Sequence, residues 1–284
     1  MKKILVPCDF SKPAISAYRQ ALDFAVQSEG AIHLLHVIET PLLNDTLLMP
    51  TLNFEEQLIK DLKENAESQF EEILNENKSK KVKTTFDIKF GGVPTCILEY
   101  IKEHAIDLVM MGSNGASGIK EYIIGSNAER IVRQSLVPVL VVKEYYNWPI
   151  RNIVFPNHLD MDDQDGLLLK VKSLQNFFKA KLHMVWINTP TNFIVDTVTR
   201  ERLETFANRH MLTDYTINIF NHISTEEGIH EFAKMINADM IAMGTHSHTG
   251  LYHLTNGSVA EDVVNHSRRL IWTYTLKREP VVTN

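Results

Sequence analysis

One pattern occurs twice along this chain, and a repeat of this length limits the fold more than any other feature. The stretch KILVPCD, which contains Pro7, returns as RNIVFPNH with Pro156, at an offset of 149. The stretch IDLVMMGSNGASG returns as ADMIAMGTHSHTG, at an offset of 132. Two aligned blocks in the same order indicate two copies, residues 1–146 and 147–284. The second copy is the shorter one in its middle.

Apolar runs alternate with helical patterns inside each copy. In the first copy, strands are predicted at 4–6, 32–38, 84–90, 108–111 and 139–142. Helices are predicted at 14–26, 54–73, 97–104 and 127–134. This alternation predicts an α/β fold, with a parallel sheet and helices on both of its faces.

The composition narrows the classes of partner. A formal charge of −6, from 29 Lys and Arg against 35 Asp and Glu, provides no basic surface for nucleic-acid phosphates. No apolar stretch reaches the ~20 residues of a membrane-spanning helix, and the apolar run after the first lysines is too short for a secretory signal. The two cysteines, Cys8 and Cys96, fit a reduced protein. We therefore expect a cytoplasmic protein that binds neither nucleic acid nor a membrane.

The residues with the clearest chemical meaning follow a buried strand of the first copy. Gly112, Gly115, Gly125 and Ser126 form the spacing G-x2-G-x9-G-S. Glycines after a strand let backbone N–H groups approach a ligand, because no Cβ intervenes. Gly125 and Ser126 open a predicted helix, and the N-terminus of a helix attracts anions. The spacing therefore predicts a phosphate-binding loop.

A second interpretation of these residues needs no ligand. Ser126 with Glu129, and Ser258 with Glu261 in the second copy, have the spacing of capping boxes. Helix capping alone, however, does not ask for three glycines on the preceding loop. The chain has no P-loop motif and no G-x-G-x-x-G after its first strand, so neither a P-loop NTPase nor a dinucleotide dehydrogenase is indicated.

The first strand, the phrase DLVMMGSNGASG, the glycine spacing and the ending VPVLVV resemble the universal stress protein family. The resemblance extends over essentially the whole chain. It implies two tandem Rossmann-like α/β domains, each with a five-stranded parallel sheet in the order 3-2-1-4-5 and helices on both faces. In that order, strands 1 and 4 border the point where an open α/β sheet binds ligands. The domain at 1–146 would keep the nucleotide-binding motif, and the domain at 147–284 would have a degenerate one.

Members of the ATP-binding branch of this family hold adenosine at these strand ends. Carried over by position, Pro7, Asp9 and the backbone at Val37 would hold the nucleoside. The remaining site residues would be Met111, Gly112, Asn114, Gly115, Gly125, Ser126 and Asn127. A carboxylate repels phosphate, so Asp9 fits only the base or ribose side; its alternative role is to cap the first helix. Mg²⁺ would accompany the ATP.

The resemblance implies a stress-response regulatory protein that binds an adenine nucleotide, ATP, in its N-terminal domain. Two alternatives stay open. The first is a weak ATPase or phosphotransferase, since slow hydrolysis needs only positioning and Mg²⁺. The second is a scaffold without nucleotide, which carries a histidine-lined metal or ligand site in the C-terminal domain. Neither paired carboxylates nor a Ser-His-Asp order is evident, so we expect no catalytic residues.

The second copy departs from the motif chiefly on the nucleoside side. It keeps the glycines Gly244 and Gly257, followed by Ser258. The counterparts of Gly115, Asp9 and Val37, taken at the two offsets, are Ser247, His158 and Trp186. A tryptophan that points into the crevice would occupy the space of adenine. These differences predict one nucleotide per chain, bound by the first copy.

Nine of the 12 histidines lie in the second copy. Four of them are expected at the carboxyl edge of its sheet: His158, His222, His246 and His248. Imidazoles from neighbouring strand ends are suitable Zn²⁺ ligands. The alternative is a set of solvated loop histidines.

The last strand of each copy, at 137–142 and 270–276, is apolar and lies at the edge of its sheet. Exposed edges of this kind invite pairing. Because domains of this family often dimerise through this strand, we expect the two copies to pack about an internal pseudo-two-fold axis. The chain would then resemble a complete dimer, and a further homodimer stays open.

Overall fold

The computed structural model describes residues 1–39, 52–77, 81–113, 124–147, 149–157, 165–246, 259–267 and 269–276. The N-terminal half contains β1 (Lys3–Pro7), α1 (Lys12–Ser28), β2 (Ala31–Ile38), α2 (Leu52–Glu76), β3 (Lys83–Phe90), α3 (Val93–Glu103), β4 (Leu108–Gly112), α4 (Ser126–Gln134) and β5 (Val139–Val142). The C-terminal half contains β6 (Asn152–Pro156), α5 (Asp165–Phe178), β7 (Lys181–Asn188), α6 (Asp196–Arg209), β8 (Tyr215–Asn221), α7 (Thr225–Met235), β9 (Met240–His246), α8 (Val259–His266) and β10 (Leu270–Leu276).

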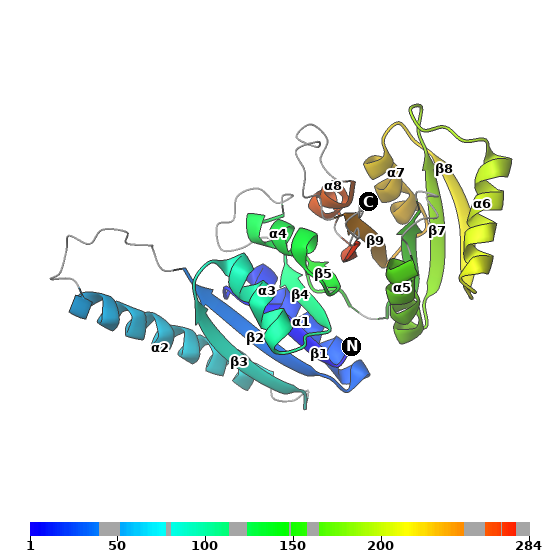
Figure 1. Ribbon diagram of the computed structural model, residues 1–284. Coiled ribbons are helices and arrows are strands. Elements are labelled where there is room, and N and C mark those ends of the chain that lie inside the picture. Colours follow the sequence, from blue (N-terminus) through cyan, green and yellow to red (C-terminus); the bar gives the residue numbers. More distant parts are fainter. Residues whose placement is uncertain are drawn as a thin grey trace, which may run out of the picture.

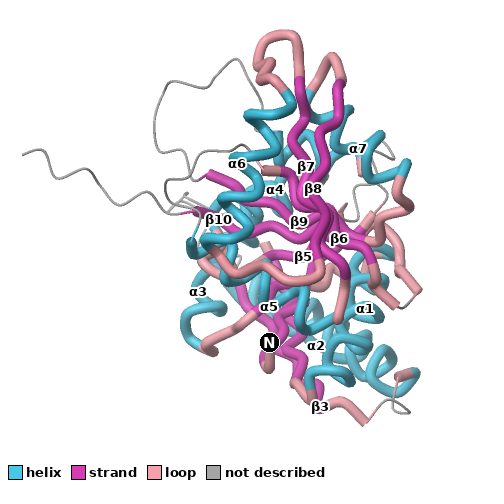
Figure 2. Tube along the Cα trace, turned by 90° about the vertical axis from the view of Figure 1, so that its right-hand side faces the viewer, coloured by secondary structure: helices cyan, strands magenta, loops and turns pink. Residues whose placement is uncertain are grey.

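The strands form one ten-stranded sheet in the order β3-β2-β1-β4-β5-β10-β9-β6-β7-β8. Within each half the strands are parallel and follow the predicted order 3-2-1-4-5. The two halves lie side by side (Figure 1), and the strands run through the middle of the molecule with helices around them (Figure 2). The α/β fold predicted from the sequence is therefore present in both halves.

The two halves meet at their last strands. β5 and β10 pair antiparallel, with Val141 opposite Ile271 and Leu140 opposite Trp272. The Thr273 hydroxyl also donates a hydrogen bond to the Val139 carbonyl, at 3.3 Å. An antiparallel joint between two parallel half-sheets gives the internal pseudo-two-fold arrangement expected from the sequence. Since β5 and β10 already pair with each other, a homodimer of two chains would have to form through another surface.

Two apolar layers cover the two faces of the sheet. Tyr18 of α1 and Phe206 of α6 belong to the core on one face, and Ile97 of α3 and Phe232 of α7 belong to the core on the other. Both cores take residues from both halves, so the packing is continuous across the β5–β10 joint.

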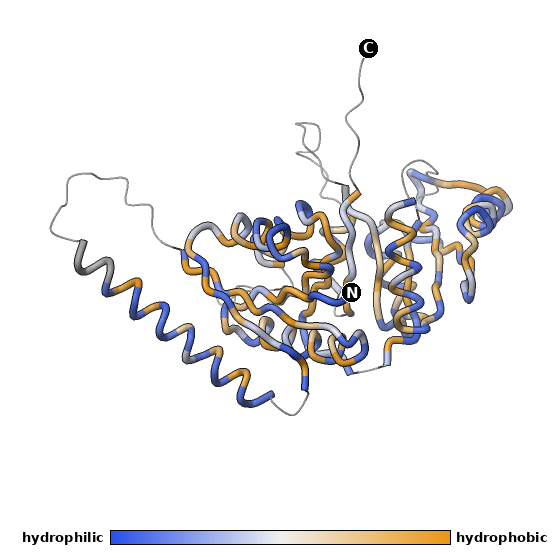
Figure 3. Tube along the Cα trace, turned by 60° about the horizontal axis from the view of Figure 1, so that its bottom comes forward, coloured by the Kyte–Doolittle hydropathy of each residue, from blue (hydrophilic) through white to orange (hydrophobic). Residues whose placement is uncertain are grey.

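Helix α2, with 25 residues, is the longest of the helices that the structure describes. Hydrophilic and hydrophobic residues alternate along its trace (Figure 3), because its apolar positions recur at helical spacing. Of the helices that the structure describes, none is long and apolar enough to cross a membrane.

The second half carries one extra residue between its first two strands. Pro7 pairs with Leu35 in the first half, and Pro156 pairs with Val185 in the second. The offset between the halves is therefore 149 on β6 but 150 on β7. A shift of one residue along a strand moves a side chain to the opposite face of the sheet, and this shift changes the comparison of the two halves below.

Candidate functional site

A cavity of about 180 Å³ opens at the carboxyl edge of the sheet, between the ends of β1 and β4. Eight of the ten residues predicted for the nucleotide site line it: Pro7, Asp9, Val37, Met111, Gly112, Gly125, Ser126 and Asn127. The other two, Asn114 and Gly115, lie outside the described residues. The topology thus brings together residues that are up to 120 positions apart in the sequence.

Asp9 begins the turn that leads from β1 into α1. Its Oδ1 accepts hydrogen bonds from the backbone N–H of Ser11, at 3.1 Å, and from the Ser11 hydroxyl, at 2.5 Å. Ser11, not Asp9, is the N-cap of α1, and its Oγ accepts from the Ala14 N–H. Phe10, between them, has a φ of 63°, a backbone conformation that costs a non-glycine residue about 1 kcal/mol or more. The alternative role predicted for Asp9, as the cap of the first helix, is therefore wrong.

Gly112 ends β4 directly beneath the start of α1. A Cβ at this position would lie 2.7 Å from the backbone carbon of Pro13 and 2.9 Å from the Ala14 nitrogen. This glycine is required because α1 packs against β4. The sequence argument that Gly112 leaves room for a ligand needs this correction, since helix backbone fills that space.

The N-terminus of α4 faces the cavity, and its N-cap residue has no side chain that could cap the helix. Its N-cap is Gly125, which has no side-chain cap hydrogen bond, so Ser126 is already the first residue of the helix. The Glu129 carboxylate instead forms an ion pair with Arg133, one helical turn further along, with 3.3 Å between Oε1 and Nη2. The capping box predicted from Ser126 and Glu129 is therefore not formed. The backbone N–H groups of the first turn are suited to an anion.

Gly125 has ordinary extended torsions, with φ −64° and ψ 147°. Its N–H donates to the Ser113 carbonyl at 2.6 Å, which ties the start of α4 to the end of β4. A valine can adopt these torsions, so the backbone of Gly125 is not strained. Any need for glycine here lies in the space beside its Cα.

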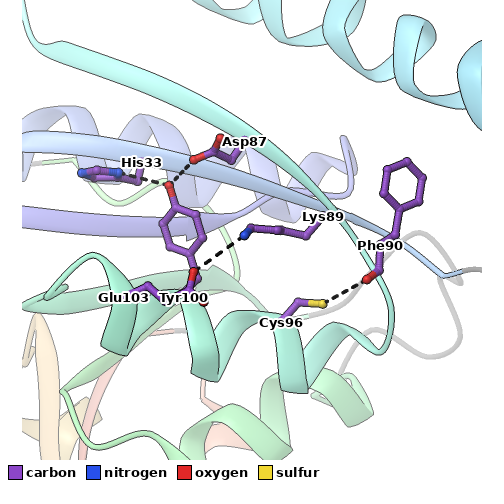
Figure 4. Close-up of polar contacts among 7 residues, drawn as sticks. All are labelled: His33, Asp87, Lys89, Phe90, Cys96, Tyr100 and Glu103. Atoms are coloured by element: carbon purple, nitrogen blue, oxygen red, sulfur yellow. Dashed lines mark hydrogen bonds and ion pairs between the residues drawn. The ribbon is translucent and has the colours of Figure 1, made fainter.

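The cavity wall on the α3 side is apolar and firmly held. Val37, Val93 and Ile97 line it. Figure 4 shows how α3 is fastened to β3: the Tyr100 hydroxyl donates to Asp87 at 2.5 Å, and Lys89 lies 3.7 Å from Glu103. Such a wall offers a flat base an apolar surface whose position is fixed.

A larger cavity, of about 520 Å³, adjoins the first beside α2. The two cavities share Asp9, His36, Val37, Val93 and Asn127. The second is completed by Phe10, Ile38, Glu39, Leu62, Asn65, Ala66 and Gln69. The two cavities are therefore neighbours at the same edge of the sheet, the second one toward α2.

Nine residues that line the first cavity were not predicted as site residues: Cys8, Ser11, Ala14, Leu35, His36, Val93, Ile97, Ser113 and Ala128. The Nδ1 of His36 lies 2.8 Å from the Cys8 carbonyl oxygen. Ser11 and His36 stand close in sequence to Asp9 and Val37, and that adjacency was the signal available. Cys8 itself is buried, and burial raises the pKa of its thiol to about 12. It is therefore a small packing residue and not a reactive thiol.

The corresponding crevice of the C-terminal half is filled differently from the prediction. With the extra residue, the counterpart of Val37 is Ile187, and the counterpart of His36 is Trp186. The Trp186 ring packs against Leu203 on the α6 face, and its Nε1 donates to Asn188. The prediction that Trp186 stands at the Val37 position is therefore wrong.

Ile187 takes up the space at this position. Ile187 is buried. A Cβ atom added to Gly228 of α7 would lie only 2.5 Å from the Cγ2 of Ile187, so α7 packs directly onto this side chain. Val37, by contrast, is half-buried and borders the cavity. In the second half α7 therefore approaches β7 closely at Ile187, whereas in the first half the corresponding Val37 borders the cavity.

The predicted zinc ligands are described only in part. His158 and His248 lie outside the described residues, and only the backbone of His246 is described. The Nδ1 of His222 lies 3.1 Å from the Ser224 carbonyl oxygen and 3.8 Å from Glu227. Within the described ranges, no three His, Cys, Asp or Glu side chains group so as to hold a metal ion. The zinc site stays a prediction.

Comparison with known proteins assigns the class. The family model described as "Universal stress protein family" matches residues 1–143 and 220–269. Universal stress protein MJ0577 of Methanocaldococcus jannaschii is 32% identical over 154 residues, which make up 50% of this chain and 94% of that protein. Universal stress protein G of Salmonella typhimurium is 31% identical over 146 residues, 50% of this chain and 99% of the relative. The chain belongs to the universal stress protein family.

A solved structure extends the likeness to the whole chain. The crystal structure of a universal stress protein from Archaeoglobus fulgidus DSM 4304 covers 96% of this chain and 98% of its own, with a TM-score of 0.75 and 20% identity. This likeness concerns the fold. It matches the present chain across both halves, whereas each of the two relatives above corresponds to about half of it.

Proposed function

We propose that the N-terminal half binds ATP in the crevice between β1 and β4, and that the protein acts as a stress-response regulator in the cytoplasm. The phosphates would lie at the N-terminus of α4, and the nucleoside would extend past Asp9 toward Val37. The observation that carries this proposal is the start of α4, where the N-cap is a glycine without a side-chain cap and the first turn borders a cavity lined by eight residues predicted for the site.

The phosphate end has the right donors for an anion. The N–H groups of Ser126, Asn127 and Ala128 belong to the first turn of α4, and the N-cap residue Gly125 offers them no side-chain acceptor. The partial positive charge of a helix N-terminus stabilises phosphate by about 0.3–1 kcal/mol in exposed sites. No Lys or Arg lines either cavity in the described part of the chain. Backbone N–H groups would therefore provide the main attraction.

The nucleoside end has complementary chemistry. Asp9 is exposed and lies at the border of both cavities, where its carboxylate can accept hydrogen bonds from ribose hydroxyls. The apolar wall of Val37, Val93 and Ile97 suits the flat face of a base. The first cavity is too small for a whole nucleotide, since drug-sized ligands occupy roughly 300–1,000 Å³. The proposal therefore needs the adjoining cavity as well.

Mg²⁺ would arrive with the nucleotide. The described residues contain no metal-holding group of three acidic, histidine or cysteine side chains. A magnesium ion that is held mainly by phosphate oxygens and water needs few protein ligands.

Native mass spectrometry of the freshly purified protein tests this proposal. We expect a mass increase of one adenine nucleotide per chain, which disappears after denaturation and dialysis and returns when ATP and Mg²⁺ are added. A protein that neither carries a nucleotide nor takes one up at millimolar ATP would contradict the proposal. A zinc-sized mass increase that chelation removes would instead support the scaffold alternative.

A further inference from the structure

The C-terminal half holds the helix that forms the phosphate end of the proposed site. The side-chain Oδ1 of Asn265, on α8, accepts a hydrogen bond from the backbone N–H of Ile124 at 2.8 Å. Ile124 immediately precedes Gly125, the N-cap of α4. These two residues are 141 positions apart in the sequence, and each belongs to a different half.

The other end of α4 is held from the same half. The Val132 carbonyl accepts hydrogen bonds from the hydroxyl of Thr275 at 3.0 Å and from that of Thr245 at 3.3 Å. The Thr245 hydroxyl also lies 3.1 Å from that of Thr275, and its single proton can be donated to either of these two acceptors. All three side-chain and backbone groups are buried. Strands β9 and β10 thus fix the C-terminal part of α4, while α8 fixes the turn before it.

Asn265 is itself held in place by the N-terminal half. The ammonium of Lys143, just after β5, donates a hydrogen bond to the backbone carbonyl oxygen of Asn265. Asn265 therefore connects the residue that precedes α4 to the residue that follows β5. A residue whose backbone is held in this way can present its side chain to the turn from a fixed position.

Ile124 needs this acceptor. The residue is buried, with 4% of its surface exposed. A buried backbone N–H that loses its partner loses a hydrogen bond and gains no water. The turn would then move to satisfy the N–H group, and Gly125 would move with it.

We propose that Asn265 is a positioning residue for the nucleotide site, and that the C-terminal half serves the N-terminal site by fixing the start of α4. This inference rests on the proposed function. It assigns the second half a role that requires no nucleotide of its own: the direction of the Ser126–Ala128 N–H groups depends on a side chain of the other half. ATP, whose phosphates meet this turn, depends on Asn265, whereas adenosine, which lacks phosphates, does not.

The test compares Asn265→Leu with Asn208→Leu, a control on the exposed surface of α6. Affinities for ATP and for adenosine are measured on the full chain by titration calorimetry. We expect Asn265→Leu to weaken ATP roughly three- to tenfold, the effect of one lost hydrogen bond, and to leave adenosine affinity unchanged. Asn208→Leu should change neither affinity.

Amide exchange provides a readout that needs no ligand. The Ile124 amide should exchange slowly in the wild type, faster in Asn265→Leu, and slowly again in Asn265→Asp, whose carboxylate oxygen can accept the same hydrogen bond. Unchanged ATP affinity in Asn265→Leu, or equal losses for ATP and adenosine, would overturn the inference while leaving the proposed function in place. A wild-type protein that binds no ATP would overturn both.

Discussion

The two halves share one fold but differ in the space at their strand ends. In the first half, Val37 is half-buried beside a cavity, and Gly91, with a φ of 139°, begins the connection into α3. In the second half, Ile187 packs onto Gly228, and His222 stands where Gly91 stands in the first. A duplicated domain can thus keep its topology while the packing between its second strand and the helix beside it changes.

The connection between the third strand and the following helix also differs between the halves: the second half replaces a glycine and is one residue longer. Gly91 donates to the Ile38 carbonyl, and His222 donates to the Asn188 carbonyl, so the two positions correspond. The second half then has one additional residue, Ile223, which is 84% exposed, before the N-cap Ser224. An L-residue does not readily adopt the torsions of Gly91, and a longer connection avoids them.

The largest expected effect is the loss of ATP binding in Gly125→Val. The valine side chain would stand at the N-cap of α4, in the space proposed for phosphate. The fold should persist, because φ −64° and ψ 147° suit valine. Equilibrium binding of ATP should fall below detection, while circular dichroism and melting temperature change little. The matched change Gly257→Val, in the second copy, should leave binding as it is. If Gly257→Val were the variant that loses ATP, the assignment to the first half would be reversed.

The second effect concerns stability and contrasts the two crevices directly. Ile187→Ala should lower the free energy of unfolding by about 2–5 kcal/mol, because it opens a cavity in a packed core. Val37→Ala should cost about 1 kcal/mol or less, since this side chain already borders a cavity. Urea unfolding of both variants measures the contrast. Similar costs at the two positions would show that the crevices are equally filled.

The third effect is a partial loss of affinity in Asp9→Ala. The variant removes a charged acceptor proposed to bind the ribose, and ATP binding should weaken by about 1–3 kcal/mol. It also removes the acceptor for Ser11. Asp9→Asn keeps an oxygen that can accept from Ser11 and removes only the charge, so we expect an intermediate affinity for this variant. An Asp9→Ala variant that binds ATP as tightly as the wild type would remove Asp9 from the site.

The smallest effect tests a feature that the halves have in common. His33 and His183 occupy corresponding strand positions, and burial lowers the pKa of both below the ordinary 6.5. Neutral His183 donates from Nε2 to Asn152, at 3.0 Å, and its Nδ1 accepts from the Thr216 hydroxyl, at 2.9 Å. A lowered pKa in the folded state means that stability is present above pH 6.5 and is lost as the pH falls through the folded pKa. His183→Gln should therefore reduce the loss of stability between about pH 7 and 5. An unchanged pH profile would contradict this assignment.

The sequence predicted the features that repeat and missed those that depend on one inserted residue. The paired blocks around Pro7 and Pro156 predicted two copies of a parallel α/β fold, and the resemblance to the universal stress protein family implied the strand order 3-2-1-4-5. The same resemblance implied the site residues, which lie at parallel strand ends that converge on one edge. Trp186 was misplaced because the extra residue between β6 and β7 carries no motif. A shift by one then reverses the face of every later residue on that strand.

Other features could not be predicted from the sequence, because they depend on backbone torsions and on contacts between distant segments. Whether Ser126 caps α4 or begins it depends on torsions at Gly125, and both arrangements use the same residues. The spacing of the motif indicates a ligand-binding role for Gly112, but it does not show that the N-terminus of α1 packs upon this glycine. The contact between Asn265 and Ile124 joins two halves, so no pattern within one half could indicate it.

The central claim is the asymmetry of the two crevices, and the stoichiometry of ATP binding tests it most directly. Isothermal titration of the full chain with ATP and Mg²⁺ counts the sites without assuming where they lie. The present account predicts one ATP per chain, a single site that Gly125→Val removes. Two equivalent ATP sites per chain would contradict it.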